Sequence, residues 1–319
     1  MDKKEKYKEF AKKEKLPVFM QPYWLDSVCE DDMEWDVILY EKGGEIWGSF
    51  VYVIKKKHGF TLITMPKLTQ FLGPYIRYPK GQKYYKKLSW EKEIMNYFID
   101  NLPKFDYFNM NFHYSITNWL PFYWRGFKQT TRYTYVIDDL SDLERVFNNF
   151  DNSYRNKIRK AQKIVEIKRG LSIESFYNIN RLTFERQGIK IPYSLNFLKL
   201  HEKVLMSYSS REIFYAIDKE GKIHSSLYLT WDDFSSYVHM VGEDPNLRKS
   251  SAGILLVWEV IKYTKDILNL NIFDFEGSII KNVEQVRRSF GAIQKPYFNI
   301  FKVNSKILKI KHCLRDIFK

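Results

Sequence analysis

A chain of 319 residues with 45% hydrophobic and 17% aromatic side chains is long enough for two cores and too apolar to be disordered as a whole. No apolar run reaches the length of a membrane span, about 18 residues, and the N-terminus is charged where a signal peptide is apolar, so we expect a cytoplasmic protein. The two cysteines and six scattered histidines predict neither a disulfide framework nor a metal site.

The net charge of +14 predicts an anionic partner. Nucleic acid, nucleotide phosphates, coenzyme A and an anionic membrane surface, which the protein would bind peripherally, all fit this charge. Solubility and charged termini explain it as well. The charge alone therefore selects no partner.

The N-terminal half has the pattern of a hairpin and a third strand, followed by alternating helices and strands. The predicted elements are strands at 35–40, 45–55 and 59–64, a helix at 89–101, a strand at 106–112, a helix at 116–124 and a strand at 131–138. The last strand ends just before Ser141, which can cap the next helix. A domain boundary is therefore expected near residue 138.

A predicted helix at 153–163 follows this boundary. It places Arg155, Arg159 and Lys163 one turn apart along one face, and we call these three residues the basic strip. A solvated helix face and a phosphate-binding surface both produce this pattern. The sequence leaves the two interpretations open.

The C-terminal half repeats the order of elements. Its predicted elements are strands at 211–218, 223–231 and 234–242, a helix at 250–268, a strand at 271–276, a helix at 282–289 and a strand at 295–303. This repeat predicts an internal duplication, with domains at 1–138 and 139–304, each a mixed sheet with helices on both faces. The basic, amphipathic tail at 305–319 is expected to pack back on the protein as a helix.

A polar loop precedes the helix that begins near residue 250. The first N–H groups of a helix lack partners within it and attract anions, and small residues let a pyrophosphate come close. We call this segment the anion loop; it comprises Arg248, Lys249, Ser250, Ser251, Ala252 and Gly253. An ordinary helix capped by Ser250 fits the pattern equally well. We expect Gly253→Val to block a phosphate and to leave the fold intact.

The spacing Arg248-x-x-Ser251-x-Gly253 resembles the Arg/Gln-x-x-Gly-x-Gly/Ala loop of the GNAT superfamily, which holds the coenzyme A pyrophosphate after the fourth strand. Ser251 stands where that loop has its first glycine. Further stretches resemble the Fem-type branch, the tandem-GNAT aminoacyltransferases and their acetyltransferase-like relatives. They are LPVFMQPYWLDSV (16–28), FLGPYI (71–76), SYRNKIRKAQKIVEIKRG (153–170) and FDFEGSIIKNVEQVRRSFGA (273–292), where Val286-Arg287 replaces the family's Phe-Lys pair.

The resemblance implies an α/β (α+β) fold of two tandem GNAT-like domains, with mixed sheets flanked by helices. It also implies an acyltransferase that transfers an acyl or aminoacyl group to an amine of a cell-envelope precursor, as in peptidoglycan synthesis, or of an amino sugar. The donor would be acyl-CoA or aminoacyl-tRNA, with tRNA then a partner and no permanently bound cofactor. The alternative is a non-catalytic module of the same fold that binds RNA or a nucleotide-linked ligand.

Four residues near the end of the chain are the predicted catalytic groups. Asp274 and Glu276 alternate onto one face of a strand, where either can accept the amine proton or bind a cationic acceptor. Arg287 and Arg288 can face the oxyanion or a phosphate. An ion pair between these carboxylates and arginines is equally open. His239 lies in mid-strand and is expected to be a core residue.

Overall fold

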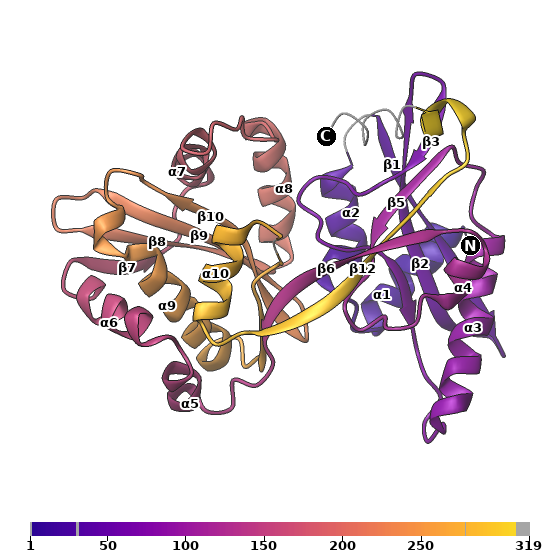
Figure 1. Cartoon of the computed structure of the whole chain (residues 1–319), viewed down its shortest axis with the longest axis horizontal. Helices are drawn as coiled ribbons and strands as arrows, with labels where there is room; N and C mark the ends of the chain where they lie inside the picture. The colour runs from indigo at the N-terminus through magenta and orange to yellow at the C-terminus, as the bar shows by residue number, and fades with distance from the viewer. Residues whose placement is uncertain (1, 30–31, 278, 311–319) are drawn as a thin grey trace. The chain divides into compact units, whose positions relative to one another are not determined.

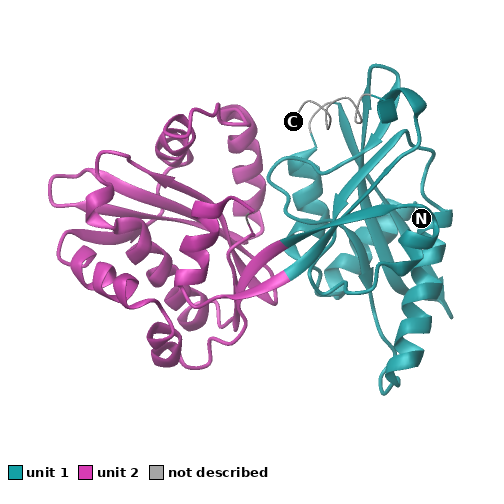
Figure 2. Ribbon diagram, viewed as in Figure 1, with its two compact units in different colours: residues 1–132, 296–319 teal, residues 133–295 magenta. Residues whose placement is uncertain are grey.

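The computed structural model describes residues 2–29, 32–277 and 279–310. The chain divides into two compact units, residues 1–132 with 296–319 (unit 1) and residues 133–295 (unit 2; Figure 2). Strands β6 (Lys128–Ile137) and β12 (Ile293–Val303) each have residues in both units. The division into domains at residue 138 stays a prediction.

Unit 1 contains a mixed sheet in which β2 pairs antiparallel with β1, β3 and β4, and β3 pairs parallel with β5. The β1–β2 hairpin turns through Gly43 and Gly44, whose φ angles of 61° and 78° favour glycine. The elements, in chain order, are α1 (Lys3–Lys13), η1 (Val18–Met20), α2 (Pro22–Val28), β1 (Met33–Lys42), β2 (Glu45–Lys57), β3 (Phe60–Ile63), β4 (Gly73–Ile76), α3 (Tyr84–Asp100), β5 (Tyr107–Asn111) and α4 (Leu120–Trp124) (Figure 1).

Aromatic rings fill the core of unit 1. The ring of Phe50, on β2, lies 5.6–6.5 Å from the rings of four other phenylalanines, measured between centroids. These are Phe98, Phe108, Phe112 and Phe122, all fully buried. Burying such rings stabilises the unit mainly through the hydrophobic effect.

Unit 2 is built on a sheet with the strand order β6-β11-β10-β9-β8-β7. Its elements, in chain order, are α5 (Leu143–Asn148), α6 (Asn152–Ala161), β7 (Val165–Arg169), α7 (Ile173–Glu185), α8 (Leu195–Ser207), β8 (Arg211–Asp218), β9 (Ile223–Trp231), β10 (Ser235–Glu243), η2 (Arg248–Ser250), α9 (Ala252–Asp266), β11 (Ile272–Asp274) and α10 (Lys281–Ser289). Strands β8, β9 and β10 form an antiparallel meander, and β10 pairs parallel with β11.

Helices cover both faces of this sheet, so β9 is buried on both sides. Leu227 and Leu229 join the core cluster that includes the buried face of α9, whereas Tyr228 hydrogen-bonds to Glu202 of α8. Helix α6 packs on α9, and α7 packs on β9 and β10. The alternation of side chains along β9 thus separates an apolar face under α9 from a face under α7 and α8 that carries polar groups.

The last strand of each repeat pairs with a strand of the other repeat. In unit 2, β6 pairs antiparallel with β11, and in unit 1, β12 pairs antiparallel with β5. A part-buried amide cluster helps to fix the β12 register, since the buried Asn299 donates through Nδ2 to Asn109 Oδ1 at 3.1 Å and to Asn111 Oδ1 at 2.8 Å. This exchange explains why unit 1 includes residues from both ends of the chain.

The predicted hairpin, meander and long helix are confirmed, with differences at some ends. The helix expected at 116–124 begins only at Leu120, where Pro121 occupies its first turn. The strand expected at 271–276 ends at Asp274. Residues 306–310 of the tail are helical, with Ile307 and Ile310 exposed, and residues 311–319 lie outside the described residues.

The pairing of β12 with β5 predicts how fragments of the chain will fold. Residues 1–138 expressed alone lack β12, so the edge of β5 is unpaired and Asn109 and Asn111 lose their partner. We expect this fragment to aggregate or to unfold without cooperativity in urea, followed by circular dichroism. The same fragment with residues 293–304 fused through a flexible linker is the control and should unfold cooperatively. A monomeric, cooperatively folded 1–138 would show that β12 is dispensable.

Candidate active site

The parallel pair β10–β11 separates after only three residue pairs. Residues 235–237 pair with 272–274, and β10 continues to Glu243. A β-bulge lies just past this point, because Val238 pairs with Leu229 and Met240 with Tyr228, which leaves His239 as the extra residue. A bulge bends its strand and redirects a side chain. Beyond Tyr237, β10 therefore no longer pairs with β11.

His239 and Glu276 bridge this separation. Nδ1 of His239 lies 2.8 Å from Oε1 of Glu276, and their side chains are 2% and 13% exposed. The carboxylate favours the proton on Nδ1, which makes Nε2 the basic nitrogen of the neutral ring. Glu276 has a φ of 50°, an uncommon value for a residue other than glycine. The chain bends here at some energetic cost, and the bend aims the carboxylate at His239.

Asp274 ends β11 as a buried carboxyl. Its Oδ1 accepts hydrogen bonds from Thr134 Oγ1 at 2.5 Å and from the Glu276 N–H at 2.8 Å, while Oδ2 is buried and has no hydrogen-bond partner among the residues that the structure describes. Burial raises the pKa of Asp274 to about 7, and the Arg287 charge opposes this rise. A β-carbon on Gly277 would meet the Tyr133 carbonyl oxygen at 2.0 Å, so only glycine fits there.

A second buried polar group flanks His239. The ring of Tyr228 lies 6.0 Å from the His239 ring, and its hydroxyl donates to Glu202 Oε2 at 2.5 Å. Arg211 pairs with the other oxygen of Glu202. Burial raises the pKa values of both Tyr228 and Glu202, and Arg211 opposes both shifts. This network holds the Tyr228 ring edge-on to the His239 ring.

The anion loop lies at the start of α9, beside the end of β10. Arg248 pairs with Glu243 at 2.5 Å, Lys249 is exposed, and Ser251 has a φ of 59° directly before Ala252. A buried relay anchors the loop: Ser250 Oγ lies 2.8 Å from His224 Nδ1, and His224 Nε2 lies 3.0 Å from Asp218 Oδ2. Ser250 is therefore an anchor of the loop and not the N-cap of α9, which is Ser251.

Gly253 faces the sheet. A β-carbon there would lie 3.3 Å from Ser225 Oγ and 3.4 Å from Glu243 Oε1. Both neighbours are side-chain atoms, which would have to move by a few tenths of an ångström to admit a larger residue. That Gly253→Val leaves the fold intact therefore stays a prediction.

The basic strip lies on an element next to the anion loop. Helix α6 contacts both η2 and α9. Arg155 donates to Asn148 Oδ1 at 3.3 Å and to Asn152, and Arg159 donates to Asn156 Oδ1 at 3.2 Å. Lys163 is exposed in the turn after α6. These acceptors are uncharged amides, so the hydrogen bonds do not neutralise the charge of the two guanidinium groups.

The two predicted arginines differ in their surroundings. Arg288 is 65% exposed and pairs with Glu284 at 3.0 Å on its own helix, α10. Arg287 is half-buried, and its charge acts on Asp274. The structure thus brings together Asp274, Glu276 and Arg287, and it adds His239, which the sequence gave reason to treat as core. The sequence offered one signal for His239: it lies in the strand predicted at 234–242, between the strands predicted at 223–231 and 271–276.

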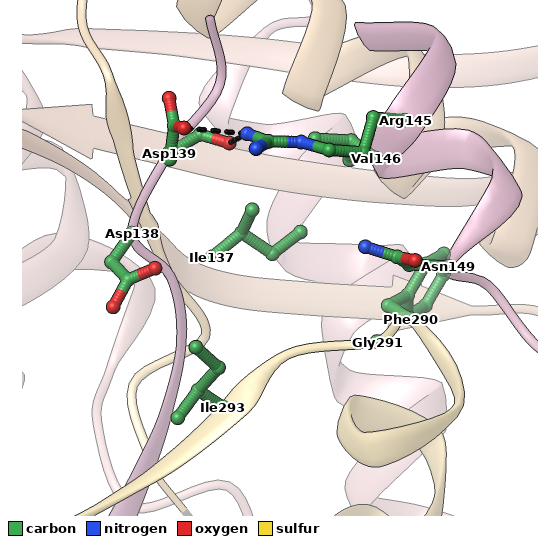
Figure 3. A pocket seen from close by; sticks show the side chains of 9 residues that line it. All are labelled: Ile137, Asp138, Asp139, Arg145, Val146, Asn149, Phe290, Gly291 and Ile293. Atoms are coloured by element: carbon green, nitrogen blue, oxygen red, sulfur yellow. Dashed lines mark hydrogen bonds and ion pairs between the residues drawn. The ribbon is translucent and has the colours of Figure 1, made fainter. Parts of the chain in front are cut away.

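A cavity of about 310 Å³ lies elsewhere in unit 2 (Figure 3). The cavity borders Ile137, which pairs with Phe273 of β11. Phe273 is the residue before Asp274, where the pairing of β11 with β10 ends. Figure 3 shows the side chains of Asp139 and Arg145 pointing at each other. The two form an ion pair of 2.5 Å, and Asp138 pairs with Lys295 at 2.8 Å. These charges already neutralise one another, so the separation of β10 and β11 is the stronger candidate for chemistry.

Comparison with known proteins identifies the domain in which these residues lie. Residues 148–279, which include the anion loop, His239 and Glu276, match the family model of the acetyltransferase (GNAT) domain. This segment of the chain is therefore a GNAT-type acetyltransferase domain by its sequence. No curated protein matches it in sequence.

Solved structures extend the likeness in fold over most of the chain. The crystal structure of FemX is 14% identical with a TM-score of 0.70, covering 93% of this chain and 96% of that one. A tandem GNAT protein from the clavulanic acid biosynthesis pathway is 8% identical with a TM-score of 0.52, covering 90% and 97%. L-PGS from Bacillus licheniformis is 10% identical with a TM-score of 0.52, covering 92% and 90%.

These likenesses confirm the expected fold class, an α/β fold of the tandem GNAT kind with a mixed sheet flanked by helices. The enzyme class, acyltransferase, is confirmed with it. Among the helices of residues 2–29, 32–277 and 279–310, none combines the length and the apolar character that a bilayer crossing needs.

The buried carboxyl of Asp274 predicts a pH dependence of stability. Its pKa is raised from 3.8 to about 7 in the folded protein, so its stabilising contribution is complete below about pH 4 and is lost as the pH rises through 7. Wild type should therefore lose roughly 3 kcal/mol more of its unfolding free energy between about pH 5 and pH 8 than Asp274→Asn, which cannot ionise.

Urea unfolding at the two pH values measures this difference. Asp233→Asn, an exposed carboxyl in the β9–β10 turn, is the control and should keep the wild-type dependence. Equal pH dependence in wild type and Asp274→Asn would mean that Asp274 is ionised in the folded protein.

Proposed function

We propose that this acyltransferase transfers an acyl or aminoacyl group to an amine of a cell-envelope precursor, as in peptidoglycan synthesis, or of an amino sugar. The proposal rests on one observation: in unit 2, the anion loop and the His239–Glu276 pair lie on adjoining parts of the same strand, β10 and the loop that follows it. A donor with a phosphate at one end and a reactive carbonyl at the other fits this arrangement.

The donor's phosphates would bind at the start of α9. Backbone N–H groups and the positive end of the helix attract the anion, and Lys249 supplies a mobile charge. Arg155 and Arg159 on α6 extend the positive surface. Acyl-CoA carries a pyrophosphate for such a site, and aminoacyl-tRNA carries a phosphodiester backbone. Both donors stay within the proposal, and neither is a permanently bound cofactor.

The carbonyl would lie where β10 and β11 separate. The acceptor amine attacks the carbonyl carbon, and the resulting tetrahedral intermediate must lose a proton from nitrogen as the donor's leaving group departs. His239 Nε2 accepts this proton, and Glu276 stabilises the imidazolium that forms. Backbone N–H groups of the bulge and the charge of Arg287 stabilise the oxyanion. No covalent enzyme intermediate is needed.

Asp274 and Arg288 have supporting roles in this scheme. Asp274 orients the Glu276 backbone through its 2.8 Å hydrogen bond and can serve as a second proton acceptor near neutral pH. Arg288, at the surface of α10, would contact the acceptor or a phosphate. We also propose that the enzyme works in the cytoplasm, with tRNA as a partner if the donor is aminoacyl-tRNA, and that it binds anionic membrane surfaces peripherally.

Donor binding is the first test. Coenzyme A should bind the wild-type protein in calorimetry, more weakly at high salt, and Lys249→Ala should weaken it about fivefold by removing one phosphate contact. His224→Ala should weaken it as well, because the loop loses its anchor. Lys203→Ala, an exposed lysine of α8, is the control.

The outcomes separate the donors. Binding of aminoacyl-tRNA, and not of coenzyme A, through Lys249 would assign tRNA as the donor. The basic strip and the charge of +14 favour one rival, a non-catalytic RNA-binding module. RNA binding that is insensitive to Lys249→Ala, with no binding of either donor, would support that rival and contradict the proposal.

Turnover tests the proton path. His239→Gln should lower kcat by roughly 10²–10³ with little change in KM for the donor, because the base acts in the chemical step. Glu276→Gln should lower it less, since the imidazole remains. His58→Gln, at an exposed turn of unit 1, is the control. Of the two arginines, Arg287→Ala should reduce kcat more than Arg288→Ala. A His239→Gln enzyme of normal kcat and normal thermal stability would exclude His239 as the base.

A further inference from the structure

Unit 1 exposes large apolar side chains on two neighbouring helices. Helices α3 and α4 pack against each other (Figure 1). Six residues of these helices form what we call the aromatic face: Tyr84, Tyr85, Leu88, Leu120, Tyr123 and Trp124, which are 74%, 60%, 36%, 48%, 58% and 56% exposed. The opposite side of α3 is the core side, where Ile94 and Phe98 are fully buried. The aromatic face is therefore not needed to fold the unit, and its exposure calls for another explanation.

The six residues belong to one surface. Tyr85, Leu88 and Lys92 follow the helical spacing of three and four residues and so share a stripe of α3. At the end of that stripe, Lys92 Nζ lies 5.4 Å from the ring of Trp124 on α4. The stripe of α3 and the exposed rings of α4 thus adjoin at this contact.

Lysines surround the aromatic face. Residues 78–92 contain five lysines and one acid, Glu91; the lysines are Lys80, Lys83, Lys86, Lys87 and Lys92. Glu91 is 6% exposed and accepts hydrogen bonds from Tyr78 at 2.9 Å and Asn118 at 3.0 Å, so it faces away from solvent. Lys86 and Lys87 lie 5.5 Å and 4.4 Å from the rings of Tyr85 and Tyr78. The charge that this surface presents is positive.

We propose that the aromatic face docks the protein on an anionic lipid bilayer. Tyr and Trp side chains suit the level of the lipid headgroups, where their rings are shielded and their polar atoms stay hydrated. Leu88 and Leu120 reach the start of the acyl chains, and the lysines contact lipid phosphates. Single-stranded RNA would stack on the rings and bind the lysines too, but it gives no gain to exposed leucines. The aliphatic residues favour the bilayer.

This inference deepens the peripheral membrane binding proposed above by naming the surface that docks, and it does not depend on the proposed acyl transfer. It assigns a role to unit 1, whereas the proposed chemistry lies in unit 2. Docking is a property of the α3–α4 surface and can be measured without any donor or acceptor. Its failure would leave the transfer reaction untouched, and the failure of the transfer reaction would leave docking untouched.

Co-sedimentation of the full chain with vesicles tests the proposal. The wild-type protein should bind phosphatidylglycerol–phosphatidylcholine vesicles and much less to pure phosphatidylcholine, and salt should weaken the binding. Lys83→Glu/Lys86→Glu should weaken it by at least tenfold, since each lysine near such a surface contributes about fivefold. Tyr85→Ser/Trp124→Ser should weaken it by a similar factor without changing the net charge.

Matched controls are Lys203→Glu and Tyr208→Ser, an exposed lysine and a 59% exposed tyrosine of unit 2, which should bind vesicles like the wild type. Circular dichroism confirms that each variant is folded. A wild-type protein that does not bind anionic vesicles, or serine variants that bind as wild type, would overturn the proposal. Loss of binding to single-stranded polyuridine by the same variants, with no vesicle binding by the wild type, would assign the face to RNA.

Discussion

The candidate site depends on the early end of one parallel strand pair. Strand β11 pairs with β10 over three residues and then ends. The chain turns at Glu276, whose φ is 50°, and the backbone of Gly277 then packs closely against the carbonyl group of Tyr133. On the other side, the bulge at His239 bends β10. Without both interruptions the strands would continue side by side, and backbone hydrogen bonds would close the edge that a ligand needs. The His239–Glu276 hydrogen bond spans the opening they create.

The anion loop is held by a buried hydrogen bond between Ser250 and His224 and by an ion pair at the surface. Ser250 is tied to His224 and through it to Asp218, and Arg248 is tied to Glu243 at the end of β10. Anchoring of this kind fixes backbone N–H groups before a ligand arrives, which lowers the entropy cost of binding. The site is therefore positioned by the sheet at both ends, at the loop through β9 and β10 and at the proton acceptor through β10 and β11.

Much of this arrangement follows from the sequence. Alternating apolar residues defined the meander of unit 2, helical spacing defined α9, and the small residues after Arg248 marked the loop. The sequence could not reveal the bulge, because a one-residue shift in register leaves the composition of a strand unchanged. His239 therefore resembled a core residue. Nor could it separate Arg287 from Arg288, since one residue along α10 turns a side chain by about 100° and decides whether it faces Asp274 or solvent.

The exchange of final strands has a consequence for the order in which the protein is made. Asn109 and its partner Asn299 are 190 residues apart in the chain. A ribosome that adds about 5–20 residues each second will expose the edge of β5 for many seconds before β12 has left the exit tunnel. During that time, unit 2 can form around β6 while unit 1 waits, although unit 1 was synthesised first. Unit 2, which leaves the ribosome last, can therefore be completed first. Strand β12, which follows it in the chain, then completes unit 1.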